Sequence, residues 1–264
     1  MRLDRMGSMH QSRLSFLRQF LRRAAKENWK FKRDLFEINA NGVGRALYRL
    51  STPLRDYTLI CFSHDLPDEM RSDRVIASAW DATFTLYDGR PTPDDLERLE
   101  KHVPYQEEGR LTQNELCLSR ANRSVRLWDY VLDCLSNGNQ PNLDRVRDVG
   151  YLMRTTAVYG SGKFGSADRR VVENREEANS PFQLEMMTVY LIRTFVMDLI
   201  EYLAKIKNPD RAVKLDSDIR RSFGVGNSTG LGMAPFLVNH PRLILSLIHI
   251  SEPTRPERIA YGGL

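Results

Sequence analysis

Apolar and polar residues alternate between Trp29 and His64, which is the spacing of strands with one buried face. Asn41-Gly42 supplies a turn signal between two apolar segments of this region. The alternating residues are Ala46, Tyr48 and Leu50, followed by Tyr57, Leu59 and Cys61. We therefore predict a small antiparallel meander of about three strands in this region.

Beyond His64 the apolar residues recur every three or four positions, which predicts helices. Thr92-Pro93 and Asn142 are typical of residues at a helix N-terminus, so two of these helices should begin there. The predicted helices cover residues 72–88, 92–102, 114–136 and 142–158.

The segment 181–206 is apolar on nearly every side of a helix. Ser180, Pro181 and Gln183 have the form of a capping box with proline in the first helical turn. A helix that is apolar all round lies in the middle of a core. These patterns together predict an α+β fold that is mainly α. In it, a small N-terminal antiparallel meander precedes a multi-helix body around the buried helix 181–206.

Basic residues gather at the N-terminus of the chain. Residues 1–33 hold ten Lys or Arg and two acidic residues, a balance of +8, whereas the other 231 residues hold 29 basic and 32 acidic residues, a balance of −3. In residues 12–27 the apolar side chains share one helical face with Arg and Lys around it. This predicts a basic amphipathic helix within residues 1–27, either docked on the body or contacting nucleic acid, an anionic membrane surface or an acidic partner. No segment has the composition of a transmembrane span.

The three cysteines and five histidines are too scattered for a disulfide framework or a zinc site. We expect Cys61, Cys117 and Cys134 to be inert or buried thiols in a reducing, cytoplasmic compartment. The sequence predicts no metal site and indicates no particular cofactor.

The C-terminal residues of the chain resemble the translation of a sequencing adapter. Read as codons, the eleven residues Leu245–Arg255 resemble one frame of the transposase-end adapter used in short-read sequencing libraries. We therefore expect residues 245–264 to be adapter read-through. Residues 28–244 should then form a single α-rich domain that is truncated at its C-terminus.

Half of the fourteen glycines outside that tail lie in two stretches, residues 160–165 and 224–232. Glycine lets a ligand approach the backbone closely, and free N–H groups beside small polar side chains cradle phosphate or carboxylate. Arg154 and Lys163 would add fixed positive charge. The candidate ligand-binding residues are Arg154, Gly160, Ser161, Gly162, Lys163, Gly165, Gly224, Gly226, Asn227, Ser228, Thr229 and Gly230. The alternative is that both stretches only connect helices, with glycines at the helix C-termini.

Neither stretch has a nucleotide-binding motif. Gly160–Lys163 resembles half of a phosphate loop, but the Walker spacing is absent, which excludes a P-loop NTPase. The spacing of a Rossmann fingerprint after a strand is also missing, which counts against a dinucleotide site.

Three residues are candidates for proton transfer. His64 beside Asp65 could act as a general base with its orienting carboxylate, and His240 follows the second glycine stretch. The alternatives are a loop with exposed charges for the pair and a histidine at a helix C-terminus for His240.

A basic ridge is a further candidate for contact with an anion. Its members step by three along the predicted helix 114–136, and they are Arg120, Arg123 and Arg126. The alternative is ion pairing along a solvated helix face with Asp129 and Asp133.

The sequence therefore predicts a protein that binds a phosphorylated or carboxylated small molecule between the two glycine-rich stretches. It leaves open whether the protein is also an enzyme. The alternative is an interaction protein that uses the basic helix 12–27.

Overall fold

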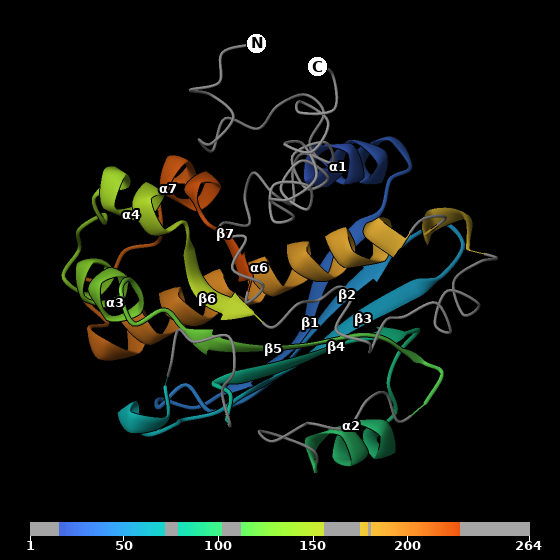
Figure 1. Ribbon diagram of the computed structural model, residues 1–264, viewed down its shortest axis with the longest axis horizontal. Helices are drawn as coiled ribbons and strands as arrows, with labels where there is room; N and C mark the ends of the chain where they lie inside the picture. The colour runs from blue at the N-terminus through green and yellow to red at the C-terminus, as the bar shows by residue number, and fades with distance from the viewer. Residues whose placement is uncertain (1–15, 72–78, 102–111, 156–174, 179–180, 228–264) are drawn as a thin grey trace, which may run out of the picture.

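The centre of the protein is a seven-stranded sheet (Figure 1). The computed structural model describes residues 16–71, 79–101, 112–155, 175–178 and 181–227. The strands are β1 Lys30–Ile38, β2 Gly44–Ser51, β3 Asp56–Ser63, β4 Ala82–Asp88, β5 Glu115–Arg123, β6 Tyr151–Thr155 and β7 Gly224–Asn227. They lie in chain order, and each pairs antiparallel with the next except β6 and β7, which are parallel. The first three strands confirm the predicted meander.

Helices cover both faces of this sheet. The long α6 crosses one face, α2 lies on the opposite face, and α3, α4 and α7 gather beside β6 and β7 (Figure 1). The helices are α1 Phe16–Lys26, α2 Pro93–Glu100, α3 Trp128–Ser136, α4 Leu143–Val149, α6 Pro181–Lys207 and α7 Ser217–Ser222. Two short 3-10 turns, η2 Asp68–Met70 and η3 Glu176–Ala178, complete the described elements.

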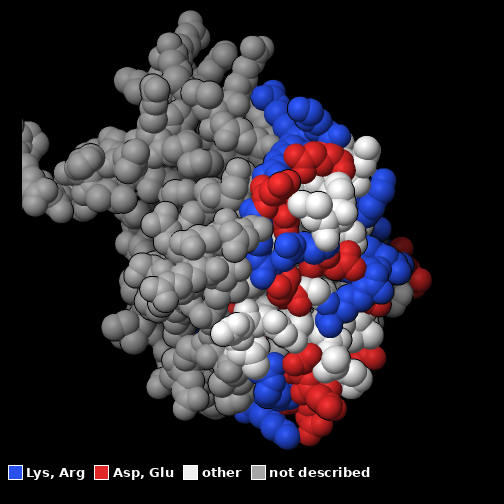
Figure 2. Space-filling model, turned by 90° about the vertical axis from the view of Figure 1, so that its right-hand side faces the viewer, with Lys and Arg blue, Asp and Glu red and all other residues white. Residues whose placement is uncertain are grey.

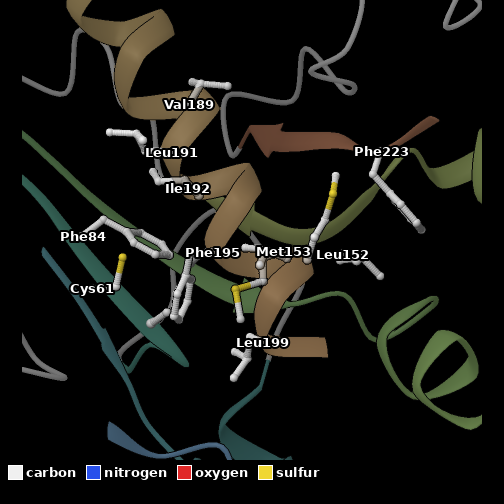
Figure 3. Close-up of a cluster of buried hydrophobic side chains, with 14 of the residues drawn as sticks. Cys61, Phe84, Leu152, Met153, Val189, Leu191, Ile192, Phe195, Leu199 and Phe223 are labelled. Carbon is white, nitrogen blue, oxygen red and sulfur yellow. The ribbon is translucent and has the colours of Figure 1, made fainter. Parts of the chain in front are cut away.

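The main core lies between α6 and the sheet, as the apolar pattern of residues 181–206 predicted. Phe195 of α6 is fully buried, and its ring centroid lies 5.7 Å from that of Phe84 on β4 and 6.2 Å from that of Tyr48 on β2. Figure 3 shows Phe195 between side chains of the sheet and of its own helix. A smaller core on the opposite face joins Leu99 of α2 to Ile60 and Phe62 of β3.

The prediction of a mainly α fold is wrong, because the sheet continues well beyond the meander. β4 occupies much of the predicted helix 72–88, and β5 occupies the first half of the predicted helix 114–136. Both strands are buried on both faces over most of their length. A strand with two buried faces loses the alternation of apolar and polar residues, so it resembles a helical segment in the sequence.

The predicted helix 142–158 is correct only in its first half. Asn142 caps α4 by accepting hydrogen bonds from the backbone N–H groups of Asp144 and Arg145 at 2.9 and 3.0 Å. The helix then ends at Gly150, which is left-handed with φ +75°. The chain continues directly into β6, whose residues are mostly buried.

The described part of the basic helix, α1, is docked on the body. The guanidinium of Arg23 donates to the backbone carbonyls of Glu176 and Glu177 in η3, at 2.8 and 3.3 Å. Arg175 in turn donates two hydrogen bonds to Asp88 at the end of β4, at 2.8 and 2.6 Å. The structure thus links α1 through η3 to the sheet.

Candidate functional site

A pocket of about 170 Å³ opens at one end of the sheet, where β5 leads into α3. Its walls come from η2 and the residue after it, from the end of β5, and from the first turn of α3. Its lining residues are Asp68, Arg71, Arg123, Ser124, Val125, Trp128 and Asp129. We call this site the Arg123 pocket.

The fully buried Asp81 organises the polar groups behind this pocket. Its carboxylate accepts hydrogen bonds from Nε of Arg71 at 3.1 Å and from the backbone N–H of Arg123 at 2.9 Å. Its backbone carbonyl accepts from the N–H of His64 at 2.8 Å, and its N–H donates to Asn122 at 2.9 Å. Asp81 therefore connects the end of β3, the start of β4 and the end of β5.

Arg123 is a largely buried cation, with a side chain 12% exposed, and it has little electrostatic compensation. Its Nε and Nη2 atoms are buried and have no hydrogen-bond partner, and Nε lies 3.8 Å from the carboxylate of Asp81. The guanidinium carbon lies 5.0 Å from the ring centroid of Trp128, a cation–π distance. Burial lowers the pKa of Arg123 from its usual value, although the charge of Asp81 opposes this effect. An unsatisfied buried guanidinium is costly to a fold, so its presence calls for a reason.

The turn between β1 and β2 lies close to this guanidinium. A Cβ atom added at Gly42 would lie 3.1 Å from Nη2 of Arg123 and 3.3 Å from Leu203 of α6. Any larger residue at this position would push on the arginine. The guanidinium of Arg123 therefore lies between the turn at Gly42 and the ring of Trp128.

One further group beside Arg123 offers an unused hydrogen bond. Ser124 is fully buried and lines the pocket, and its hydroxyl has no hydrogen-bond partner. The N-cap residue of α3, Leu127, makes no side-chain capping hydrogen bond. Instead, the backbone N–H groups of Leu127 and Trp128 donate to the backbone carbonyl of Ser124 at 3.3 and 2.9 Å.

The acidic residues of the pocket lie mainly at its rim. The side chain of Asp68 is 94% exposed, and Asp129 is also exposed. Arg71 donates to Asp68, to Asp65 at 3.2 Å and to Asp81. Water screens the charges of exposed carboxylates much more than those of buried groups. The interior holds Arg71, Arg123 and Asp81, so its formal charge is +1.

The structure places His64 behind this pocket and Asp65 near its rim. Asp65 pairs with Arg71, and Nε2 of His64 is buried without a hydrogen-bond partner. Burial lowers the pKa of His64 to about 4, against a smaller opposing effect from Asp81. A neutral imidazole is consistent with a base, but Asp65 is engaged elsewhere. His240 lies outside the described residues.

The two glycine-rich stretches follow neighbouring strands. Arg154 on β6 lies opposite Gly226 on the parallel strand β7, and Thr155 lies opposite Asn227. Gly224 begins β7, so the second stretch starts as a strand of the sheet. The remaining predicted ligand residues, Gly160, Ser161, Gly162, Lys163, Gly165, Ser228, Thr229 and Gly230, lie outside the described residues.

Arg193 of α6 holds the chain just before β7. Its Nε donates to the backbone carbonyl of Phe223 at 2.7 Å, and its Nη2 donates to that of Arg220. Burial lowers the pKa of Arg193 to about 10. This contact fixes the position at which the second glycine stretch enters the sheet.

The predicted basic ridge is not on a helix. Arg120 and Arg123 lie on β5, whereas Arg126 lies in the turn that precedes α3. The guanidinium of Arg120 lies over Trp80 at 4.7 Å, and Arg126 donates to the hydroxyl of Tyr151 at 3.0 Å. Of the three arginines, Arg123 is the one that lines the pocket.

Sequence reasoning missed Asp81, Arg71 and Trp128 as site residues. The available signal was a single acidic residue, Asp81, inside the apolar run that begins near Val75 and ends at Leu86. A charge in such a run has to be paired when the segment is buried. Its partners come from three separate elements, so only the topology could identify them.

Comparisons with protein-family models, with curated proteins and with solved structures found no match for this chain. None of the helices within the described residues has the length and apolar content of a membrane span. Within the same residues, no three His, Cys, Asp or Glu side chains come together as a metal site would require. Cys61 and Cys117 are buried free thiols, and Cys134 is a half-buried one. The case for a function therefore rests on the geometry of the site.

Proposed function

We propose that this protein binds a small molecule with a carboxylate or phosphate group in the Arg123 pocket. The observation that carries the proposal is the pair of adjacent residues, Arg123 and Ser124, whose buried donor atoms have no partner. Buried polar groups in folded proteins are nearly always satisfied, so an unsatisfied pair at a pocket indicates a missing partner. An oxyanion accepts from both groups and neutralises the buried charge.

The size of the pocket limits the ligand. Its volume of about 170 Å³ is below the roughly 300–1,000 Å³ of sites for drug-sized molecules. A small organic acid or inorganic phosphate fits this volume better than a nucleotide. Trp128 and Val125 give one wall an apolar character that suits a short carbon chain.

The proposal keeps the phosphorylated or carboxylated ligand that the sequence predicted, but its site is the Arg123 pocket instead of the two glycine-rich stretches. Arg154 and Gly226 remain neighbours on β6 and β7, so an anion site at the glycine-rich stretches stays a prediction. The basic segment 12–27 as a surface for nucleic acid, membrane or an acidic partner stays a prediction too. The free thiols are consistent with a reducing, cytoplasmic location, which we also propose.

Thermal unfolding of the full chain tests the proposal. Propanoate, butanoate or phosphate at a hundred times its dissociation constant should stabilise the protein by about 2.7 kcal/mol, which is a clear rise in Tm. Ser124→Ala should weaken this rise, and Ser217→Ala, at an exposed serine of α7, should leave it unchanged. A cooperative unfolding transition that none of these anions shifts would refute the proposal.

A further inference from the structure

The two charges of the Arg123 pocket that have no strong partner are of opposite sign. Arg123 is the cation, with Nε and Nη2 unsatisfied. Asp129 is the anion, and within the described part of the chain the structure gives its side chain no hydrogen bond or ion pair. Both line the pocket, yet they do not form an ion pair with each other.

The other charged residues of the pocket are already engaged. Arg71 donates to Asp81, Asp68 and Asp65, so Asp68 at the rim has a cationic partner. Asp129 differs from Asp68 in this respect. It also lies in the first turn of α3, one residue after Trp128.

A ligand with one charge would pair with only one of the two residues, Arg123 or Asp129. A simple anion at Arg123 and Ser124 would leave the exposed Asp129 at the rim without a partner, and the repulsion between like charges, which water screens in part, would disfavour binding. A molecule that carries both an anionic and a cationic group would pair with each. Charge-assisted hydrogen bonds at both ends would also fix its orientation.

We propose that the natural ligand of the pocket is a small amphoteric molecule with a carboxylate and a protonated amine on a short carbon chain. The carboxylate binds Arg123 and Ser124, the amine donates to Asp129, and the carbon chain lies along Trp128 and Val125. This inference rests on the proposed function, because it assigns the second end of a ligand whose first end is the anion.

Isothermal titration of the full chain at pH 7 tests it with matched pairs of probes. The pairs are β-alanine against propanoate and γ-aminobutyrate against butanoate, which differ by the amine alone. At least one amino acid should bind about tenfold more tightly than its matched acid, the value of one hydrogen bond between charged groups. Asp129→Asn should remove this difference, and it should leave the binding of the simple acids as tight as before or tighter, because a like charge is lost.

A control variant and the possible outcomes separate the two proposals. Asp144→Asn makes the same charge change at an exposed residue of α4, and it should preserve the tenfold preference. Equal affinity for amino acids and simple acids, or a preference that survives in Asp129→Asn, would overturn the amphoteric ligand alone. If no probe binds to a chain that unfolds cooperatively, the proposed function itself fails.

Discussion

Arg71 and Arg123 both line the pocket, but their electrostatic environments differ. Arg71 donates to three carboxylates, one of them the buried Asp81, whereas Arg123 has two buried nitrogen atoms without a partner. Removing one partner of a buried ion pair strongly destabilises a fold, whereas a buried guanidinium without close partners mainly costs desolvation energy. We infer that Arg71 is a structural residue and that Arg123 is retained for binding.

This contrast predicts different effects for the same substitution. Arg123→Met should leave the free energy of unfolding unchanged or raise it by about 1 kcal/mol, because a buried charge is replaced by an apolar chain of similar length. Arg71→Met should lower it by about 3 kcal/mol, because it leaves Asp81 buried with a weaker partner. Urea denaturation of both variants measures these changes. A larger loss in Arg123→Met than in Arg71→Met would contradict the assignment.

The lowered pKa of His64 predicts how the stability of the protein depends on pH. Its pKa is about 4 in the folded protein, and the ordinary value is 6.5. Between these values the unfolded chain binds a proton that the native protein does not, so stability falls as the pH drops from 6.5 to 4. The contribution of His64 is complete above pH 6.5.

His64→Phe tests this linkage because phenylalanine keeps a flat ring and cannot ionise. Relative to the native chain, the variant should lose less stability between pH 7 and pH 4.5. Urea denaturation at several pH values gives the comparison. Parallel stability curves for the two proteins would show that His64 does not titrate as described.

At this scale the sequence named three residues that lie in or near the candidate pocket. His64, Asp65 and Arg123 were candidates, but Arg123 was assigned to a helix, and Asp81 was not considered. The reason is physical. Asp81, Arg71 and Arg123 meet because three segments converge at one end of the sheet, and no spacing within a single segment reports that convergence.

At the scale of elements, α6 is the helix on which the core depends. Phe195 is fully buried against two strands, and Ile206 on the same helix is 43% exposed. Phe195→Ala should lower the free energy of unfolding by about 3–5 kcal/mol, because it opens a cavity in the core. Ile206→Ala should cost less than about 1 kcal/mol. Chemical denaturation distinguishes them, and similar costs would mean that α6 does not pack as described.

The sequence predicted those elements that carry an alternating pattern, a capping motif or a long apolar run. The meander, α2 with its Thr92 capping box, α6 and the start of α4 belong to this group. β4 and β5 are buried on both faces, and their apolar residues also fit a helical spacing, so they were missed. β3 is buried on both faces as well, but Tyr57, Leu59 and Cys61 supplied an alternation that predicted a strand. β6 was missed because Gly150 ends α4 earlier than the apolar spacing suggested.

At the scale of the whole molecule, the described residues on the face in Figure 2 do not form a patch of one sign. Blue and red side chains are interspersed there. Arg90 pairs with Asp56 at 2.9 Å and Arg175 pairs with Asp88 at 2.6 Å. In α1, Arg23 is turned towards η3, and Arg22 and Lys26 are exposed. A mixed surface of this kind gives weak long-range steering of polyanions.

The topology of the sheet explains why the pocket lies where it does. The last residues of β3, the first of β4 and the last of β5 lie at the same end of the sheet, so the polar residues there meet. α3 then adds its N-terminus and Trp128. The pocket is thus lined by two segments that lie far apart in the sequence, residues 68–71 and 123–129, and Asp81 from the start of β4 joins them from behind.

The most direct test of the account is the side-chain NMR signal of Arg123 in the full chain. The Nε–H resonance is assigned by its loss in Arg123→Met and is then followed as butanoate or γ-aminobutyrate is added. A saturable shift of this resonance, with the Nε–H signals of exposed arginines such as Arg221 unmoved, is the result that the account predicts. Saturating amounts of either compound that leave the Arg123 resonance in place would contradict a ligand at Arg123.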